Sequence, residues 1–215
     1  FKNKDLLFEA LTHRSYLNER PDLSLNHNER LEFLGDAVLE LVVTENLFKN
    51  HDDPEGILTS WRAALVNSDM LAEISKKLDL NEYILLSQGE RKDNGRARQY
   101  ILANALEALI GAIYLDQGYE NSLRFIEKNI LSEFPRVLSE KLFKDPKSLF
   151  QEESQDRLGI TPSYKVLGQW GPDHSKIFKI GAYLNEELTG LGIGPSKQEA
   201  QQKAAEDALH KKGWT

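Results

Sequence analysis

Four carboxylates recur along one segment of this chain at a spacing that would gather them on a single face of a helix. The segment Asn28–Leu41 reads NERLEFLGDAVLEL. At about 100° per residue, Glu32 and Asp36 fall about 60° and about 20° to one side of Glu29. Glu40 falls about 20° to the other side. Acids this close repel one another unless protons, cations or basic groups intervene, so the spacing indicates a cation-binding face. A solvated acidic stripe on an ordinary amphipathic helix would show the same pattern.

A second segment, Ile101–Leu115, is almost wholly apolar and carries one carboxylate, Glu107, and one amide, Asn104. These two side chains are three residues apart and share one face of a helix. A lone Glu in such a run must be paired, protonated or bound to a metal. If the two helices pack polar face to polar face, oxygen ligands from both converge on a hard cation such as Mg²⁺ or Mn²⁺. The alternative is a core Glu that is satisfied by a Ser, Arg or backbone partner.

The elements that must position these groups follow from the periodicity. Helical spacing predicts helices at 5–11, 29–49, 54–66, 68–78, 98–117 and 122–139. We expect Ser122 to cap the last of these and Gly118 to follow the end of the one before it. The segment Gln88–Arg98 has no apolar face and is predicted to be an exposed loop. Near 143–146 the pattern changes to a helix at 146–158, alternating strands at 163–170, 177–184 and 186–194, and a helix at 196–211.

Several stretches together resemble a known family, ribonuclease III. They are LTHRSY at Leu11–Tyr16, NERLEFLGDAVL from Asn28, PEGILTSWRAALVN at Pro54–Asn67 and LANALEALIGAIYLDQG at Leu102–Gly118. From about Asp145 the chain resembles a double-stranded RNA-binding domain, so the resemblance covers essentially the whole chain. It implies a mainly α fold, with an all-helical endonuclease domain at 1–140 and a linker at 141–145. A small α-β-β-β-α double-stranded RNA-binding domain would follow at 146–215.

Composition narrows the class of protein. Hydrophobic content of 40% and charged content of 28% are ordinary for a soluble globular protein. The chain has no cysteine, which excludes disulfides and thiolate metal sites and fits a cytoplasmic location. No signal peptide or membrane span is visible, so we expect no membrane partner. The net charge is −7, and residues 145–215 hold 9 basic and 10 acidic residues. Any affinity for RNA must therefore come from individual, well-positioned side-chain contacts more than from the net charge of the domain.

The resemblance assigns Glu32, Asp36 and Glu107 to the metal-ligand and catalytic positions of the family. Glu32 and Glu107 would be inner ligands, whereas Asp36 would hold a second ion or orient the water nucleophile. Glu29 lies on the same face and would support the site as an outer ligand or a subunit contact. The implied cofactor is Mg²⁺, with Mn²⁺ as a substitute, which can activate water and stabilise the phosphate during hydrolysis.

Asn104 departs from the family, which usually has Asp at this position. The amide keeps a carbonyl oxygen for a metal but loses a full negative charge, so we expect weaker metal affinity than in relatives with Asp. Three explanations stay open: a native neutral ligand, an engineered inactivating substitution, or a natural relative without activity. Tyr100 also departs from the usual Ser or Thr, which favours a lineage variant over one designed change. Glu32, Asp36 and Glu107 are all present, which favours an active enzyme.

A-form RNA is recognised through its 2′-hydroxyls and phosphates. The resemblance assigns such contacts to Arg96 and Arg98 ahead of the second acidic helix, to Lys147, Ser148, Gln151, Glu152 and Gln155 in the helix at 146–158, to His174 in the first strand connection, and to Ser196, Lys197 and Lys203 in the last helix. This last helix has Gln198 and Gln201 where the family tends to have Lys, which predicts a smaller salt dependence. The alternative to RNA binding is that 88–98 is only a solvent-exposed connection and that the last helix has only an ordinary solvent-exposed face.

The implied function is hydrolysis of double-stranded RNA to products with 5′-phosphate and 3′-hydroxyl ends, in ribosomal RNA and messenger RNA processing. Cutting both strands requires two sites, so the resemblance implies a homodimer that acts on double-stranded RNA and on no small-molecule substrate. Phe33, about 40° from Glu29 on the helix, is a candidate subunit contact or else a core residue. The alternatives are a catalytically impaired RNA-binding relative, which Asn104 keeps open, and a protein-interaction module.

Overall fold

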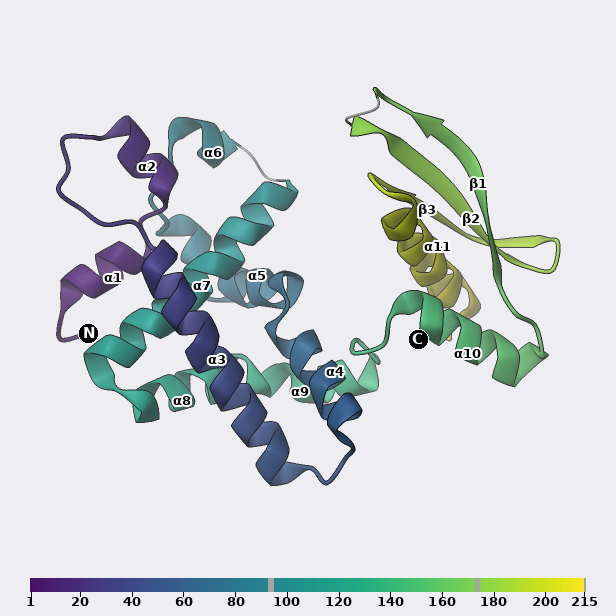
Figure 1. The fold of residues 1–215 in the computed structure, drawn as a ribbon, viewed down its shortest axis with the longest axis horizontal. Helices are drawn as coiled ribbons and strands as arrows, with labels where there is room; N and C mark the ends of the chain where they lie inside the picture. Colours follow the sequence, from purple (N-terminus) through teal and green to yellow (C-terminus); the bar gives the residue numbers. More distant parts are fainter. Residues whose placement is uncertain (93–94, 173–174, 215) are drawn as a thin grey trace. The chain divides into compact units, whose positions relative to one another are not determined.

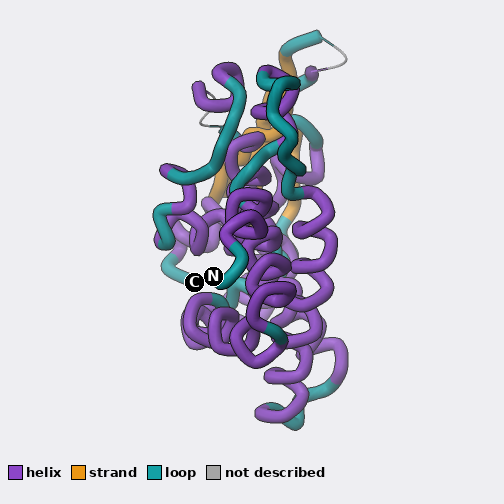
Figure 2. Tube along the Cα trace, turned by 90° about the vertical axis from the view of Figure 1, so that its left-hand side faces the viewer, coloured by secondary structure: helices purple, strands orange, loops and turns teal. Residues whose placement is uncertain are grey.

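The computed structural model describes residues 1–92, 95–172 and 175–214. The chain divides into two compact units, Phe1–Ser139 and Glu140–Thr215. Helices make up most of the described chain, and its strands all lie in the second unit (Figures 1 and 2). Within the described residues, no helix has both the length and the apolar character that crossing a bilayer requires. The predicted contact His174 lies outside the described residues.

The first unit is helical throughout, and one helix, α7, lies at its centre. Its elements are α1 (Lys4–Ala10), α2 (Arg14–Glu19), α3 (Glu29–Asn50), α4 (Glu55–Val66), α5 (Ser68–Lys77), η1 (Leu80–Glu82), α6 (Gln88–Lys92), α7 (Arg96–Gln117), α8 (Tyr119–Asn129), η2 (Leu131–Glu133) and α9 (Phe134–Ser139). Helix α7 packs against α1, α3, α5 and α8 (Figure 1). Because neighbours surround α7, its residues Leu102, Leu106 and Ile110 are fully buried, which accounts for its nearly uniform apolar sequence.

Two short α-helices of the first unit, and the 3₁₀ helix η1, were not predicted. Helix α2 is absent from the prediction, and α6 replaces the first part of the loop expected at Gln88–Arg98. Both begin with side-chain caps. The His13 ring accepts a hydrogen bond from the Ser15 amide at 3.3 Å, and the Ser87 hydroxyl accepts one from the Glu90 amide at 3.2 Å. Capping, and not apolar periodicity, defines helices this short, so the periodic pattern could not reveal them.

The single helix predicted at 122–139 is also wrong, because the chain forms α8, η2 and α9 there. Pro135 has no backbone N–H, and in a continuous helix its ring would clash with the carbonyl of Leu131. Pro135 instead occupies the first turn of α9, where a proline is tolerated. Ser122 does not cap α8 but lies buried inside it, and its hydroxyl donates to the Gly118 carbonyl at 3.3 Å. Gly118 does end α7, with a φ of 78°.

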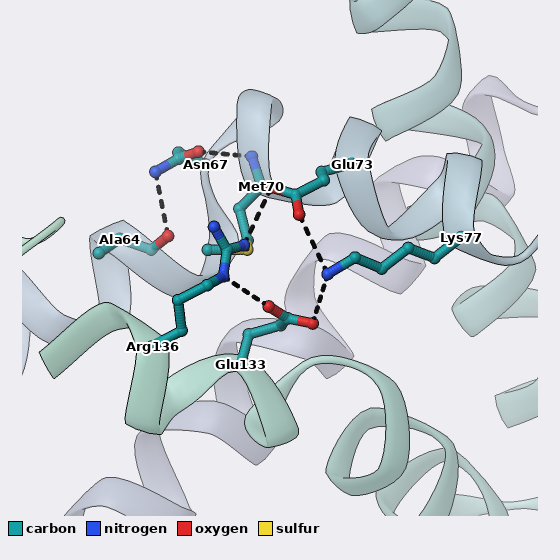
Figure 3. Close-up of polar contacts among 7 residues, drawn as sticks. All are labelled: Ala64, Asn67, Met70, Glu73, Lys77, Glu133 and Arg136. Atoms are coloured by element: carbon teal, nitrogen blue, oxygen red, sulfur yellow. Dashed lines mark hydrogen bonds and ion pairs between the residues drawn. The ribbon is translucent and has the colours of Figure 1, made fainter. Parts of the chain in front are cut away.

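A network of ion pairs joins η2 and α9, at the end of the first unit, to α5 (Figure 3). Lys77 of α5 lies 3.0 Å from Glu73 and 2.7 Å from Glu133 of η2. Arg136 of α9 completes the ring, at 2.8 Å from Glu133 and 2.9 Å from Glu73. Hydrogen bonds from Lys77 lower the pKa of both carboxyl groups. The network thereby fixes the orientation of η2 and α9 on α5.

The second unit is a three-stranded antiparallel sheet with two helices on one face. Its elements are α10 (Pro146–Leu158), β1 (Ser163–Trp170), β2 (Ile177–Leu184), β3 (Glu187–Gly194) and α11 (Lys197–Lys212), and the strand order is β1-β2-β3 (Figure 1). The Asp145 carboxylate caps α10, and the Ser196 hydroxyl caps α11. Phe150 and Ile180 are fully buried between the helices and the sheet. The α-β-β-β-α order and the helical first unit confirm the predicted fold class.

Candidate active site

The backbones of α3 and α7 are in direct contact at two glycines. A Cβ atom built on Gly35 would lie 1.7 Å from the carbonyl oxygen of Glu107, and one built on Gly111 would lie 2.2 Å from the carbonyl oxygen of Leu31. Separations this short are impossible for real atoms, so each position requires glycine. Gly35 directly precedes Asp36 and follows Glu32 by three residues. The contact of the two helices therefore sets where the acidic side chains of α3 meet α7.

Of the four acids on the predicted face of α3, the outer two are paired with basic side chains of other helices. Glu29 lies 3.2 Å from Arg14 of α2, and Glu40 lies 3.0 Å from Arg62 of α4. Glu29 also lies 3.7 Å from the His27 ring. Within the described residues, the acidic face that the helical spacing predicted therefore has an ion pair at each end and none in its middle. The middle consists of Glu32 and Asp36, the two acids that flank the contact with α7.

The structure brings these middle acids together with the polar pair on α7. Asn104 forms a side-chain hydrogen bond with Glu32. Glu107 is close enough to Asp36 and Glu32 for both to raise its pKa. Glu32, Asn104 and Glu107 are half-buried, whereas Asp36 is exposed. Four oxygen-bearing side chains from two helices thus form one site, which has a sheltered part and an edge open to solvent.

The electrostatics of the site show an excess of negative charge. Burial, followed by the charges of Asp36 and Glu32, raises the pKa of Glu107 to about 8. Burial also raises the pKa of Glu32, with contributions from Glu29 and Asp36, and the hydrogen bond to Asn104 opposes this effect. Burial and the nearby carboxylates therefore favour the protonated form of Glu107, and a bound cation would displace its proton.

The donor chemistry of the site fits a hard divalent cation. Carboxylate and amide oxygens are the ligands that Mg²⁺ and Mn²⁺ prefer, and Mg²⁺ completes its coordination with water. Within residues 1–92, 95–172 and 175–214, no three His, Cys, Asp or Glu side chains are arranged so that they alone could hold a metal. The fourth predicted ligand, Asn104, is an amide and lies outside this set of residue types. The residues that could hold such an ion are Glu32, Asp36, Asn104 and Glu107.

The predicted RNA contacts on α10 lie largely on one exposed surface. The exposed side chains are those of Ser148, Gln151, Glu152 and Gln155. Glu152 lies 2.5 Å from Lys144, and Gln155 accepts a hydrogen bond from Thr161 at 3.4 Å. Lys147 instead reaches across to α11, where its ammonium donates to Gln201 at 2.8 Å and lies 5.3 Å from the centre of the Tyr164 ring.

The other predicted RNA contacts differ in their exposure to solvent and in their contacts with other side chains. Ser196, Lys197 and Lys203 are exposed at the start of α11, where Lys203 pairs with Glu199 at 3.2 Å. Arg96 is exposed at the first turn of α7 and lies 5.8 Å from the centre of the Tyr100 ring. Arg98 is half-buried, donates to the Asn81 side chain at 2.9 Å, and has a pKa lowered by burial.

Sequence reasoning missed several residues that build the site. Gly35 and Gly111 set the contact of the helices, and a glycine in the middle of each of two long apolar helices was the signal available. Arg14 and Arg62 come from other helices, so nothing in the segments of Glu29 and Glu40 indicated them. Asn28 is 2% exposed, and its amide donates to the Ala10 carbonyl at 3.3 Å, which joins α1 to the start of α3.

Comparisons with known proteins agree with this architecture. A Ribonuclease-III-like family model matches residues 3–134, and a double-stranded RNA binding motif matches residues 146–212. A protein named Ribonuclease 3 from a Nitratiruptor species is 47% identical over 210 residues, covering 97% of this chain and 90% of the relative. Another Ribonuclease 3, from Campylobacter jejuni subsp. jejuni serotype O:2, is 46% identical over 218 residues, covering 99% of this chain and 93% of the relative.

A solved structure gives the same result for the first unit. The nuclease domain of ribonuclease III from Campylobacter jejuni, described for structural flexibility in a region involved in dimer formation, is 47% identical with a TM-score of 0.56. The match covers 63% of this chain and 91% of that chain. The first unit therefore corresponds to the nuclease domain and the second to the double-stranded RNA-binding domain. The chain belongs to the ribonuclease III family of endoribonucleases.

Proposed function

We propose that this protein is a divalent-metal-dependent endoribonuclease that hydrolyses double-stranded RNA to products with 5′-phosphate and 3′-hydroxyl ends. The observation that carries the proposal is the meeting of Glu32 and Glu107, from two helices in backbone contact, with a raised pKa for each. A bound divalent cation would compensate the charge of two carboxyl groups that are held together in this way. Processing of ribosomal and messenger RNA in the cytoplasm is the role we infer for this activity.

In the proposed mechanism, Glu32 and Glu107 provide the sheltered ligands and Asn104 contributes its amide oxygen. When bound, Mg²⁺ or Mn²⁺ supplies Lewis-acid stabilisation of the phosphate and lowers the pKa of water. Asp36 lies at the exposed edge, where its carboxylate can accept a hydrogen bond from the attacking water and orient it toward phosphorus. Glu29 remains paired with Arg14 and lies 3.7 Å from the His27 ring, which suits a supporting role at the rim of the site.

A cleavage assay on the full chain tests the proposal. An end-labelled RNA duplex is incubated with Mg²⁺, with Mn²⁺ and with EDTA, and the product ends are identified by phosphatase and ligase treatment. We expect cutting in either metal, none in EDTA, and products that carry a 5′-phosphate. Duplex binding without cutting in both metals would instead establish the alternative function, a catalytically impaired RNA-binding protein.

That alternative depends on Asn104, whose hydrogen bond to Glu32 replaces the repulsion that Asp would exert. Asn104→Asp restores a full negative charge beside two carboxyl groups, so we expect it to tighten Mg²⁺ binding by about tenfold, or ~1.4 kcal/mol. The Mg²⁺ concentration for half-maximal cleavage should fall accordingly. The Mg²⁺-induced rise in melting temperature, measured without RNA, gives a readout independent of activity. Unchanged Mg²⁺ dependence in both measurements would contradict the role given to Asn104.

Homodimer formation is proposed from an exposed apolar stripe along α3. Phe33, Leu41 and Phe48 are 82%, 57% and 76% exposed on this one helix. Phe33 also lines a cavity of about 710 Å³ together with Leu34 and Leu115. Large apolar side chains presented beside a cavity suit a two-fold contact, in which each subunit fills the cavity of the other.

We expect Phe33→Asp to shift the protein from dimer to monomer, because burying a carboxylate in an apolar contact costs several kcal/mol. Sedimentation velocity at micromolar concentration measures the change. Tyr83→Asp is the matched control, since Tyr83 is a 63% exposed aromatic side chain at the end of η1. A dimer that survives Phe33→Asp, or that Tyr83→Asp disrupts equally, would count against this contact.

A further inference from the structure

The second unit leaves one face of its sheet uncovered by its helices. Successive residues of a strand point to opposite faces. Ile180 and Leu184 of β2 lie in the core beneath α10 and α11, so the odd-numbered residues from Ile177 to Tyr183 point to the other face. We call this second side the outer face of the sheet.

The outer face carries several large apolar side chains that are exposed. Its exposed apolar side chains include Leu167, Trp170, Leu188 and Ile193, each of which keeps between 44% and 49% of its surface exposed. The strand register places Trp170 opposite Ile177 and Ile193 opposite Lys179. These side chains lie on the two outer strands, on either side of β2, and an exposed apolar patch of this kind is typical of a binding site for a partner.

Glycines shape the middle of this patch. A Cβ on Gly181 would lie 2.7 Å from Leu188 and 2.8 Å from Tyr183, because these side chains lean over it. A Cβ on Gly168 would meet only the Trp170 ring, at 3.9 Å, so the surface is recessed at Gly168. In the strand register, Lys179 pairs with Gly168 on one side and with Ile193 on the other. Lys179 therefore lies between the recess at Gly168 and the Ile193 side chain.

Two lysines make the patch basic, although the chain as a whole carries a net charge of −7. Lys165 lies 4.9 Å from the centre of the Tyr183 ring and 3.6 Å from Glu186. Glu186 belongs to the β2–β3 turn at the edge of the sheet, and its side chain is 94% exposed. Within the described part of the chain, Lys179 forms no ion pair. The centre of the patch therefore offers a positive charge surrounded by apolar side chains.

We propose that this outer face, consisting of Lys165, Leu167, Trp170, Lys179, Leu188 and Ile193, docks an acidic amphipathic helix of a partner protein. Three strands span about 10 Å between the outer two, which matches the diameter of one α-helix of about 10 Å. The apolar stripe of the helix would cover the leucine, isoleucine and tryptophan side chains. Carboxylates beside that stripe would pair with the two lysines.

Other occupants fit the outer face less well. A second copy packed about a two-fold axis would bring the central Lys179 of both chains together, and like charges oppose that contact. RNA presents phosphates and hydroxyls, which do not cover apolar side chains. Among the described residues of this unit, the predicted RNA contacts lie on α10 and at the start of α11, and these helices pack on the opposite face of the sheet.

The test uses the full chain, labelled with ¹⁵N, and two synthetic peptide probes of 16 residues. One peptide forms a helix with leucines on one face and glutamates beside them, and the other has lysine in place of every glutamate. We expect the acidic peptide to bind at least about tenfold more tightly and to shift the amide signals of β1, β2 and β3. A saturating RNA duplex should leave this binding unchanged.

Variants make the test specific. Lys179→Glu should reverse the preference in favour of the basic peptide, and Ile193→Ser should weaken both. Lys128→Glu, an exposed charge reversal on α8 in the first unit, should change neither. Unaltered melting temperature and duplex binding establish that the variants are folded. The proposal is overturned if neither peptide binds, if both bind equally, if RNA displaces the acidic peptide, or if the sheet signals shift with protein concentration alone.

Discussion

Glu107→Gln is expected to abolish duplex cleavage and, without divalent metal, to stabilise the nuclease unit at neutral pH. Burial and the neighbouring Asp36 and Glu32 raise the pKa of Glu107 to about 8, against a value of 4.5 for an ordinary Glu. Between these two pH values the unfolded chain loses a proton that the folded chain keeps. Stability therefore falls as the pH rises from about 4.5 to about 8, and a glutamine removes this loss.

The stabilisation should be absent near pH 4.5 and reach about 1–3 kcal/mol near pH 8, reduced from the full value because solvent partly screens the group. Amide hydrogen exchange of α3 and α7 in EDTA, compared with the wild type at each pH, measures it. Cleavage in Mg²⁺ should fall by at least about 10³-fold, since a metal ligand is lost. Glu127→Gln, at an exposed position of α8, is the control and should alter neither. Equal protection of both proteins at pH 8 would show that Glu107 is not destabilising.

The spacing along α3 predicted which acids share a face but not which of them remain unpaired. A helical period describes one helix, whereas the partners of Glu29 and Glu40 are Arg14 and Arg62 from α2 and α4. Only the packed fold shows that Glu32 and Asp36 are the acids facing α7. The sequence identified Glu107 correctly as an isolated carboxylate in an apolar helix, because its burial follows from the residues around it.

In the second unit, too, local sequence patterns predicted the secondary structure, whereas contacts between distant elements decided where some side chains lie. Alternation predicted its three strands to within one residue at each end, because the period of two is a local property of each strand. The exposed residues of α10 follow from the helical period as well. Lys147 and Arg98 could not be placed this way, because contacts with Gln201 and Asn81 from other elements set their orientation.

Gly35→Ala should also abolish most cleavage, but by displacing the helices. Its new Cβ would lie 1.7 Å from the carbonyl oxygen of Glu107, so α3 and α7 must separate. We expect a loss of about 2–4 kcal/mol in nuclease-unit stability, even though alanine favours helix by about 1 kcal/mol. Moving Glu107 by about 1 Å relative to Glu32 should lower the cleavage rate by about 10²-fold.

Gly56→Ala provides the matched control, because it places the same methyl group in α4 where nothing lies within 4 Å. This variant should be slightly more stable than the wild type, by about 0.5–1 kcal/mol, and fully active. Hydrogen exchange of α3 and α7 and cleavage in Mg²⁺ are measured on both glycine variants. If Gly35→Ala matched Gly56→Ala in both measurements, the close contact of the helices would have no role in building the site.

Together, Gly35→Ala and Glu107→Gln separate the geometry of the site from its charge. Both should lose cleavage, yet the first lowers the stability of the metal-free nuclease unit and the second raises it at neutral pH. Added Mg²⁺ should stabilise the wild type more than either variant, because one variant lacks a ligand and the other holds its ligands apart. Opposite stability changes with the same catalytic defect would mean that α3 and α7 hold the carboxyl groups together against their own repulsion.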